Sequence, residues 1–395
     1  MKDKKIVYVN YSPYENQANI LDFLTEEYKY VFLFSIGHHN LGKNQKTNKI
    51  TVYENKKIKK EIHLYYLPTS TRFVFTSIPV RSLLNLFQIV WQCKRLEKEY
   101  GMLDIYFTVN GFTAWVGLVL RRLGLVTKTI YWVCDYYPIN HKNKMIQTMR
   151  WLYWQFEKKT TASDVLTFHN NRIVDVWKKN NLLPKDYKPM LIPAATAKNV
   201  THIINKKNHE PIRLCFLGVL KKSMGLDYIF DSADLLSKNF PGLVIEIIGP
   251  GPDGEYFKER AKGSGVTFNF HGYITEEEVE KVISESTIGI APYMPDPSNV
   301  SYYADSAKMK KYISLGLPII ATKVHEFSEE VEACKAGVIV KYGDSQQLVD
   351  AIKEINANYT SMLKNVMKLS NKYFYKNIYP QMFALHEKSK ANSKK

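Results

Sequence analysis

Short apolar runs alternate with longer segments of helical periodicity along most of the chain, and this alternation constrains the fold more than any other feature. Asn19–Glu27 and Trp115–Arg122 are two helical segments of the first half. The apolar runs of that half are Ile6–Val9, Val31–Phe34, Ile105–Val109, Thr129–Val133, Val165–Phe168 and Met190–Ile192. Because these runs are apolar at consecutive positions, they predict strands buried on both faces, as in a parallel sheet built from βαβ units.

The same alternation restarts after a polar segment near residue 200. Its apolar runs are Leu214–Leu217, Val244–Ile248, Val266–Phe268, Ile288–Ile290, Ile319–Ala321 and Val338–Val340. Two successive series predict an α/β protein with two Rossmann-like, doubly wound parallel-sheet domains. We expect these domains over residues 1–195 and 212–370, joined by a linker over 196–211, with a C-terminal helix and basic tail over 371–395.

Charge is distributed unevenly over the 395 residues, whose formal net charge is +17. Residues 1–200 carry 30 Lys and Arg against 15 Asp and Glu, residues 201–350 carry 16 against 21, and residues 351–395 carry 9 against 2. A basic first half and tail indicate an anionic partner such as a membrane surface, unless the lysines only form a solvated surface. Since no nucleic-acid-binding motif accompanies the charge, we expect no nucleic-acid partner.

One predicted helix, Arg81–Tyr100, is apolar and aromatic in its first half and basic in its second half. Leu83, Leu86, Phe87, Val90 and Trp91 follow helical spacing. Such a helix lies either at a membrane interface or against the core of its own domain. The segment Lys144–Lys159, which contains Trp151 and Trp154, leaves the same two alternatives open.

Several motifs of catalytic and metal sites are missing. No two aspartates are separated by a single residue, no His or Cys spacing fits a zinc site, and neither a phosphate loop nor a nucleophile elbow occurs. We therefore expect no bound metal and no resident cofactor. The four cysteines are widely spaced, which favours a reducing, cytoplasmic setting. No apolar run reaches the ~18 residues of a membrane span, and the first residues resemble a strand rather than a signal peptide.

The predicted strands of the second half end in glycines and turn residues. Gly218 follows the first strand and Gly225 stands seven residues later, with Lys221 and Lys222 between them. The next two strands run into Gly249 and into a turn that contains Gly272, Tyr273 and Ile274, preceded by His271. The carboxyl ends of parallel strands bind ligands, and glycines there allow a ligand to approach the backbone. The segment therefore predicts either an anion site or a surface turn with two solvated lysines.

A second candidate anion site lies at the start of a predicted helix after the strand Ile288–Ile290. Asp305 or Ser306 can cap this helix, and Lys308 lies in its first turn. A cation is locally disfavoured at a helix start unless an anion is bound there. The arrangement suits a diphosphate, and a solvated basic face is the alternative.

Four segments within Leu214–Asp344 together resemble the donor domain of GT-B glycosyltransferases, above all of the large retaining family 4. They are LGVLKKSMGLDYIFDSADLL, VIEIIGPGPDGEYFKERA, VTFNFHGYITEEEVEKVISESTIGIAPY and AKMKKYISLGLPIIAT. The first half resembles the family more loosely, through WVCDYYP, FEKKTTASDVLTFHNN and MLIPAA.

The resemblance implies a GT-B fold, in which two Rossmann-like domains face a cleft and the C-terminal helix crosses back to the first domain. It implies a metal-independent, retaining hexosyl-type transferase that takes sugar from a UDP- or GDP-linked donor, with a glycan or lipid-linked acceptor on the first domain. Such an enzyme would act in cell-surface polysaccharide or glycolipid synthesis, on the inner face of the plasma membrane. We expect Lys308 and Asp135 to be catalytic. The expected donor-binding residues are Gly218, Lys222, Gly225, Gly249, Gly272, Tyr273, Ile274 and Ser306.

Four positions depart from the family pattern. Val219 and Met224 stand where the family often has the Arg and Lys that grip the diphosphate, and Tyr303 and Lys311 stand where it has two glutamates. The second glutamate normally accepts hydrogen bonds from the ribose, which a lysine cannot do. Cys134 also replaces the histidine that often precedes Asp135. These departures favour the alternative of a non-catalytic GT-B protein that binds glycan or partners an active glycosyltransferase.

Overall fold

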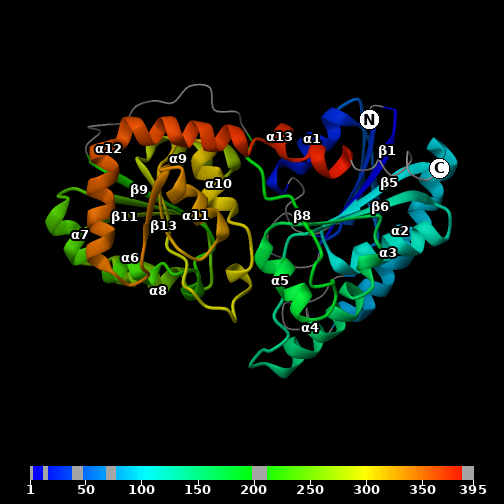
Figure 1. The fold of residues 1–395 in the computed structure, drawn as a ribbon, viewed down its shortest axis with the longest axis horizontal. Coiled ribbons are helices and arrows are strands. Elements are labelled where there is room, and N and C mark those ends of the chain that lie inside the picture. Colours follow the sequence, from blue (N-terminus) through cyan, green and yellow to red (C-terminus); the bar gives the residue numbers. More distant parts are fainter. Residues whose placement is uncertain (1–2, 12–16, 38–47, 68–76, 198–210, 385–395) are drawn as a thin grey trace. The chain divides into compact units, whose positions relative to one another are not determined.

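Each half of the chain folds around its own twisted sheet in the computed structural model, which describes residues 3–11, 17–37, 48–67, 77–197 and 211–384 (Figure 1). One unit consists of residues up to Pro193 and the described residues from Tyr379 on, and the other of Ala194–Ile378. Residues 198–210 of the predicted linker and 385–395 of the predicted tail lie outside the described residues.

The first unit contains an eight-stranded sheet of order β4-β3-β2-β1-β5-β6-β7-β8. Its strands are β1 Lys5–Asn10, β2 Tyr30–Ser35, β3 Asn48–Glu54, β4 Lys57–Leu64, β5 Leu103–Thr108, β6 Val126–Val133, β7 Val165–Phe168 and β8 Met190–Leu191. Its helices are α1 Ile20–Glu27, α2 Ile78–Tyr100, α3 Gly111–Arg122, α4 Lys144–Glu157 and α5 Asn171–Lys179, with 3-10 turns at Gln17–Asn19 and Thr160–Ala162.

An antiparallel hairpin, β3 and β4, forms the edge of this otherwise parallel sheet and was not predicted. Its two-residue turn, Asn55 and Lys56, has positive φ angles of 50° and 70°, the conformation that matches the twist of a hairpin. β4 reads KIKKEIHL and is largely exposed, so it lacks the apolar run by which a buried strand is recognised. Charged residues on such an edge also oppose pairing with another chain.

The second unit contains a six-stranded, entirely parallel sheet of order β11-β10-β9-β12-β13-β14. Its strands are β9 Arg213–Leu217, β10 Val244–Ile248, β11 Thr267–Gly272, β12 Ile288–Ala291, β13 Ile319–Thr322 and β14 Gly337–Val340. Its helices are α6 Asp227–Asp231, α7 Ala233–Asn239, α8 Gly254–Ala261, α9 Glu276–Glu285, α10 Ala307–Ser314, α11 Glu326–Ala333, α12 Ser345–Lys372 and α13 Tyr375–Ile378. Two 3-10 turns lie at Lys222–Met224 and Val300–Tyr302.

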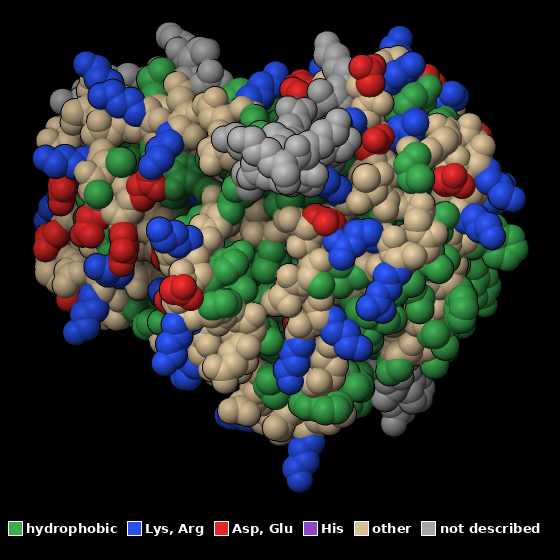
Figure 2. Space-filling model, turned by 45° about the vertical axis from the view of Figure 1, so that its right-hand side comes forward, with side chains coloured by type: hydrophobic (Ala, Val, Ile, Leu, Met, Phe, Trp, Pro, Cys, Tyr) green, Lys and Arg blue, Asp and Glu red, His purple; other side chains and the backbone are tan. Residues whose placement is uncertain are grey.

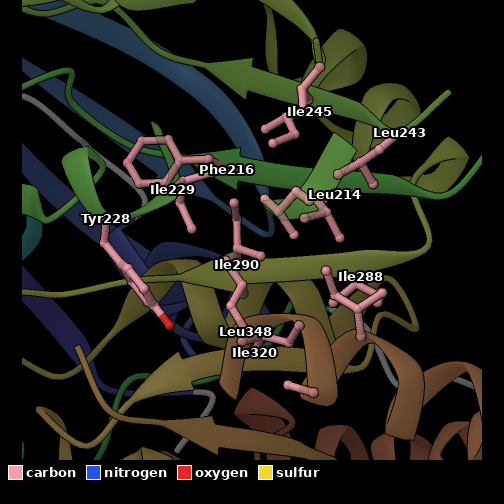
Figure 3. Close-up of a cluster of buried hydrophobic side chains, with 14 of the residues drawn as sticks. Leu214, Phe216, Tyr228, Ile229, Leu243, Ile245, Ile288, Ile290, Ile320 and Leu348 are labelled. Carbon is pink, nitrogen blue, oxygen red and sulfur yellow. The ribbon is translucent and has the colours of Figure 1, made fainter. Parts of the chain in front are cut away.

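Alternate residues of the second sheet enter two separate cores, which explains the consecutive apolar runs. Leu214 and Phe216 of β9 pack with Tyr228 of α6 and Leu348 of α12 in one core (Figure 3). Cys215 of the same strand enters the core on the opposite face, under α9, α10 and α11. The predicted two parallel, doubly wound sheets are therefore confirmed, with the edge hairpin of the first sheet as the difference.

The first sheet is likewise covered on both faces. Ile89 and Cys93 of α2 and Val116 of α3 pack on one face. On the other face the Phe383 ring lies 5.6 Å from Phe107, ring centroid to centroid, so a residue near the chain end completes the core of the first unit. Within the described ranges, no helix is both long and apolar enough to cross a membrane.

Candidate functional site

The second sheet has a switch point between β9 and β12, since the chain leaves β9 for β10 on one side and later returns to β12 on the other. The pairing of the two strands covers only Leu214 with Ile288 and Cys215 with Gly289. Their carboxyl ends, Leu217 and Ala291, lie beyond that pairing. Ligands of open α/β sheets bind at such a point.

Glycines allow the loops at this sheet edge to pack backbone against backbone. A Cβ atom at Gly249 would lie 2.2 Å from the carbonyl oxygen of Gly218, and one at Gly225 would lie 1.8 Å from that of Pro292. Both glycines also have positive φ angles, of 126° and 82°. Because any side chain would clash, these positions require glycine, and the loops after β9, β10 and β12 form one surface.

Lys308 points its ammonium group into this surface from the first turn of α10. Its Nζ lies 4.1 Å from the ring centroid of Phe216 and 4.5 Å from that of Tyr293, and a Cβ at Gly218 would lie 2.9 Å from it. The residue is buried, and no described residue forms a hydrogen bond with Nζ. Burial lowers the pKa of Lys308 to about 7. A buried amine without a hydrogen-bond partner costs folding free energy, and such an arrangement is typical of functional sites.

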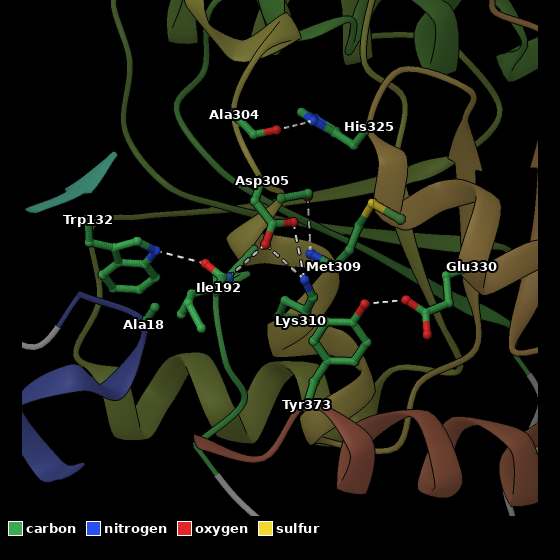
Figure 4. Close-up of polar contacts among 12 residues, drawn as sticks. Ala18, Trp132, Ile192, Ala304, Asp305, Met309, Lys310, His325, Glu330 and Tyr373 are labelled. Carbon is green, nitrogen blue, oxygen red and sulfur yellow. Dashed lines mark hydrogen bonds and ion pairs between the residues drawn. The ribbon is translucent and has the colours of Figure 1, made fainter. Parts of the chain in front are cut away.

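Lys310 stands two residues further along α10 and shows what a satisfied buried lysine looks like. Its Nζ lies 3.0 Å from Asp305 Oδ2 (Figure 4). The same Nζ also lies over the rings of Phe327 and Tyr373. Asp305 also accepts a 2.7 Å hydrogen bond from the backbone N–H of Ala194. Burial lowers the pKa of Lys310, and the charge of Asp305 opposes that shift. This lysine is therefore structural.

Two hydroxyl groups hold the start of α10 against the switch point. Ser306 caps the helix, since its Oγ accepts from the N–H of Met309, and it lies 3.0 Å from the hydroxyl of Tyr293. Tyr312 accepts a 2.7 Å hydrogen bond from the N–H of Leu217 and donates to the carbonyl of Ile290 at 3.1 Å. The hydroxyl of Tyr312 thus links the carboxyl ends of β9 and β12, where the two strands diverge.

Sequence reasoning missed the aromatic neighbours of Lys308. Tyr293 could have been found, because it follows β12 directly in the segment Ala291-Pro292-Tyr293. Phe216 gives no such signal, since an apolar residue inside a strand is expected in the core.

The other predicted donor-binding residues occupy different environments. The ammonium of Lys222 lies 3.7 Å from the ring centroid of Tyr256 on α8, so its charge is already engaged. Tyr273 follows β11 with 81% of its surface exposed, next to Gly272 and the half-buried Ile274. The exposed ring is free to stack on a flat ligand. His271, which we considered as a ligand contact, forms a 2.8 Å contact with the carboxylate of Glu246.

Lys311 is tied into ion pairs at the position where the family has a ribose-binding glutamate. Its Nζ lies 2.5 Å from Glu276 and 2.9 Å from Glu280, both on α9. Val219 is 48% exposed in the loop after β9, so no charged side chain stands at that position either. At these two positions the structure therefore places an ion-paired lysine and an exposed valine, in contrast to the family pattern.

In the first unit Asp135 follows β6, at the carboxyl edge of that sheet. Burial raises the pKa of Asp135, and the charge of Asp135 raises the pKa of Tyr137. Cys134, in place of the family histidine, contacts the carbonyl of Trp132. Asp135 is thus a partly shielded carboxyl at the edge where ligands of such sheets bind.

Glu157 of α4 was not predicted as a site residue. It is buried, its Oε1 accepts a 2.7 Å hydrogen bond from the hydroxyl of Tyr131, and burial raises its pKa to about 7. A Cβ at Gly111 would lie 2.6 Å from this carboxylate, so Glu157 packs directly under the start of α3. Over the described ranges, no group of three or more His, Cys, Asp or Glu side chains is placed to hold a metal ion.

Comparisons with known proteins identify a family model, a relative and solved structures that resemble this chain. The model of a family described as glycosyl transferases group 1 matches residues 211–358. An uncharacterized glycosyltransferase of Haemophilus influenzae is 23% identical over 283 residues, covering 67% of each chain. The structure of sucrose-phosphate synthase from Thermosynechococcus elongatus is 16% identical and superposes with a TM-score of 0.68 over 98% of this chain and 100% of that one. Anabaena HepE in complex with UDP is 13% identical, with a TM-score of 0.60 over 98% and 100%.

The resemblance noted in the sequence is confirmed by these matches. The family model covers residues 211–358 of the second unit, the part that holds Lys308 and the glycine-lined sheet edge. The solved structures share the fold over nearly the whole chain. Residues 211–358 therefore match the glycosyl transferases group 1 family, and the chain as a whole has the GT-B fold that the sequence predicted.

Proposed function

We propose that this protein transfers a sugar from a UDP- or GDP-linked donor to a glycan or lipid-linked acceptor, in the synthesis of cell-surface polysaccharide or glycolipid. The observation that carries the proposal is the buried, unpartnered ammonium of Lys308 at the switch point of the second sheet. A diphosphate supplies the anion that this lysine lacks. Anabaena HepE, which has the same fold, was solved with UDP.

The proposed reaction breaks the bond between the anomeric carbon of the sugar and the diphosphate and joins that carbon to an acceptor hydroxyl oxygen, whose proton is released. Lys308 and the N–H groups at the start of α10 would stabilise the negative charge that develops on the leaving diphosphate. Gly218, Gly225 and Gly249 would let the donor approach the backbone. Asp135 would orient the acceptor or the sugar. We propose a retaining reaction without a metal ion, in keeping with the family resemblance.

A thermal-shift panel of purified protein with UDP, GDP, ADP, CMP and common nucleotide sugars tests the donor site. A ligand at ~100 times its dissociation constant adds about 2.7 kcal/mol to the free energy of unfolding. We expect one nucleotide class to stabilise the protein and the Lys308→Ala variant to lose that stabilisation. A well-folded protein that responds to none of these ligands would contradict the proposal.

A non-catalytic protein of the same fold is the second candidate, and the ion pairs of Lys311 favour it. A lysine engaged with Glu276 and Glu280 offers no acceptor for ribose hydroxyls at this position. The two candidates differ in turnover. An enzyme releases nucleotide from its donor sugar when lipid or glycan acceptor is added, whereas a binding protein is stabilised by nucleotide without releasing it.

A cytoplasmic location, peripheral on the inner face of the plasma membrane, completes the proposal. It would bring the enzyme to lipid-linked acceptors. The basic first half and tail support it, because the cytoplasmic leaflet carries anionic lipids. Fractionation of cells into soluble and membrane-bound protein, with and without a salt wash, tests this location.

A further inference from the structure

We propose that the outward face of α2 is a docking surface for an anionic lipid bilayer. The proposal rests on the peripheral membrane location proposed above and names the surface of the first unit that binds the bilayer. Vesicle binding needs neither donor nor acceptor, so its failure is distinguishable from a failure of sugar transfer. The docking surface is inferred from which side chains α2 turns to the core, which it turns outward, and which charges accompany the outward ones.

The inward face of α2 is already satisfied by its own unit. Its buried residues are Arg81, Asn85, Ile89, Cys93 and Leu96. The partly buried Leu86 and Val90 pack against the same core. The helix therefore needs no further partner for folding on this side.

The outward face carries four large apolar side chains in one stripe. Val80, Leu83, Phe87 and Trp91 are 61%, 55%, 65% and 68% exposed. They are spaced three, four and four residues apart, so they line up along one face of the helix. Single exposed apolar residues are ordinary on a protein surface, but a continuous stripe of aromatic and aliphatic side chains marks an interaction site.

Basic residues continue the stripe toward the end of α2. Lys94, Arg95 and Lys98 are exposed, while the nearby Glu99 is paired with Lys60 at 2.6 Å. The stripe is thus apolar in its first half and cationic in its second. A bilayer of anionic lipids fits both halves, because it accepts apolar side chains at the acyl boundary and cations at its headgroups.

Helix α4 of the first unit also exposes large apolar side chains. α3 packs against both α2 and α4, and α4 exposes Met145 and Trp151. Green hydrophobic and blue basic side chains gather on the face of the first unit seen at the right of Figure 2. Bilayer contact through α2 is therefore compatible with additional contacts from α4.

Flotation of the full-length protein with lipid vesicles at physiological salt tests the proposal. We expect binding to vesicles of equal parts phosphatidylcholine and phosphatidylglycerol, and little binding to phosphatidylcholine alone. The combined variant Leu83→Ser, Phe87→Ser and Trp91→Ser is expected to lower binding at least about tenfold, since each residue loses buried apolar area. A charge variant, Lys94→Gln with Arg95→Gln and Lys98→Gln, is expected to weaken binding and to flatten its salt dependence.

Ile58→Ser is the matched control. Ile58 is 59% exposed on β4, outside α2, and is expected to leave flotation unchanged. Vesicles that do not bind the wild-type protein, or that bind the triple serine variant equally well, overturn the proposal. A wild-type dimer that becomes monomeric in the triple variant, with no flotation of either, would show instead that a second copy of the chain covers this face. Equal thermal midpoints of all variants exclude misfolding as the cause.

Discussion

The two units differ in where they carry energetically unfavourable residues: the first unit carries them on its surface, and the second carries one inside its sheet edge. Of the described large apolar side chains that are strongly exposed, ten belong to the first unit and three to the second. The second unit, in contrast, has an unpartnered ammonium, Lys308, inside its sheet edge. The sequence ranges 1–200 and 201–350, which contain most of each unit, also differ in net charge, with 30 basic against 15 acidic residues and 16 against 21.

This difference distinguishes two kinds of unfavourable feature, one buried and one exposed. A buried cation without a partner lowers stability and is expected where a small anion binds. An exposed apolar and basic helix face lowers solubility and is expected where a large surface binds. Each unit thus has an energetically unfavourable feature, and under the two proposals above a buried one receives a small anion and an exposed one a membrane surface.

The largest expected effect contrasts the two buried lysines of the second unit. Lys310→Met removes the cation that is paired with Asp305 and leaves the buried carboxylate without a counter-charge from that side chain, which costs about 3–5 kcal/mol of unfolding free energy. Urea denaturation of the variant measures this loss. If Lys310→Met unfolds at the same urea concentration as the wild type, the distinction between a structural and a ligand-binding lysine on α10 is wrong.

The next effect sharpens the contrast between the two faces of α2. Ile89→Ala opens a cavity in the first core and is expected to cost about 2–5 kcal/mol, as such truncations usually do. Phe87→Ser, two residues away on the outward face, is expected to change stability by no more than ~0.5 kcal/mol, as an exposed substitution. Equal costs for both substitutions in urea denaturation would mean that Phe87 is covered in solution.

Lys308→Met is expected to abolish nucleotide binding and at the same time to raise the stability of the free protein. It should abolish the roughly 2.7 kcal/mol of stabilisation that a nucleotide at 100 times its dissociation constant provides, while it stabilises the free protein. The folded-state pKa of Lys308 is lowered to about 7, so its stability penalty is fully present below that pH and disappears as the pH rises toward 10.5. Thermal midpoints of the free variant and wild type should therefore differ most near pH 6 and converge near pH 10. A variant that is less stable than wild type at every pH would assign Lys308 a structural role.

The sequence predicted those features of the fold whose pattern lies within one short segment of the chain. The strands of the second sheet were predicted because each is a consecutive apolar run, and β10 begins and ends where the run does. The hairpin β3–β4 was missed because its exposed strand is rich in lysine. The residues of α2 were taken as one stripe, whereas the structure separates Leu86 and Val90, against the core, from the exposed Phe87.

In the candidate site, too, the sequence predicted only features whose pattern lies within one segment. Lys308 and the glycines were predicted from their places at strand ends and at a helix start. The ring of Phe216 beside Lys308 and the ring of Tyr256 under Lys222 come from other elements, and only packing brings them together. Distances along the chain carry no signal for such pairs.

The smallest expected effect is a pH dependence of donor binding, and it connects the site's electrostatics to its function. Below pH 7 Lys308 of the free protein is already protonated, so affinity for a nucleotide sugar should vary little. Above pH 7 the amine is neutral, and because a bound diphosphate favours the ammonium form, binding must take up a proton. Affinity is then expected to fall by up to about tenfold, or about 1.4 kcal/mol, per pH unit. Isothermal titration calorimetry at pH 8 in buffers of different ionisation enthalpy measures the proton uptake directly. Because the esterified diphosphate has no proton to exchange in this range, uptake that persists in Lys308→Met would place the titrating group elsewhere.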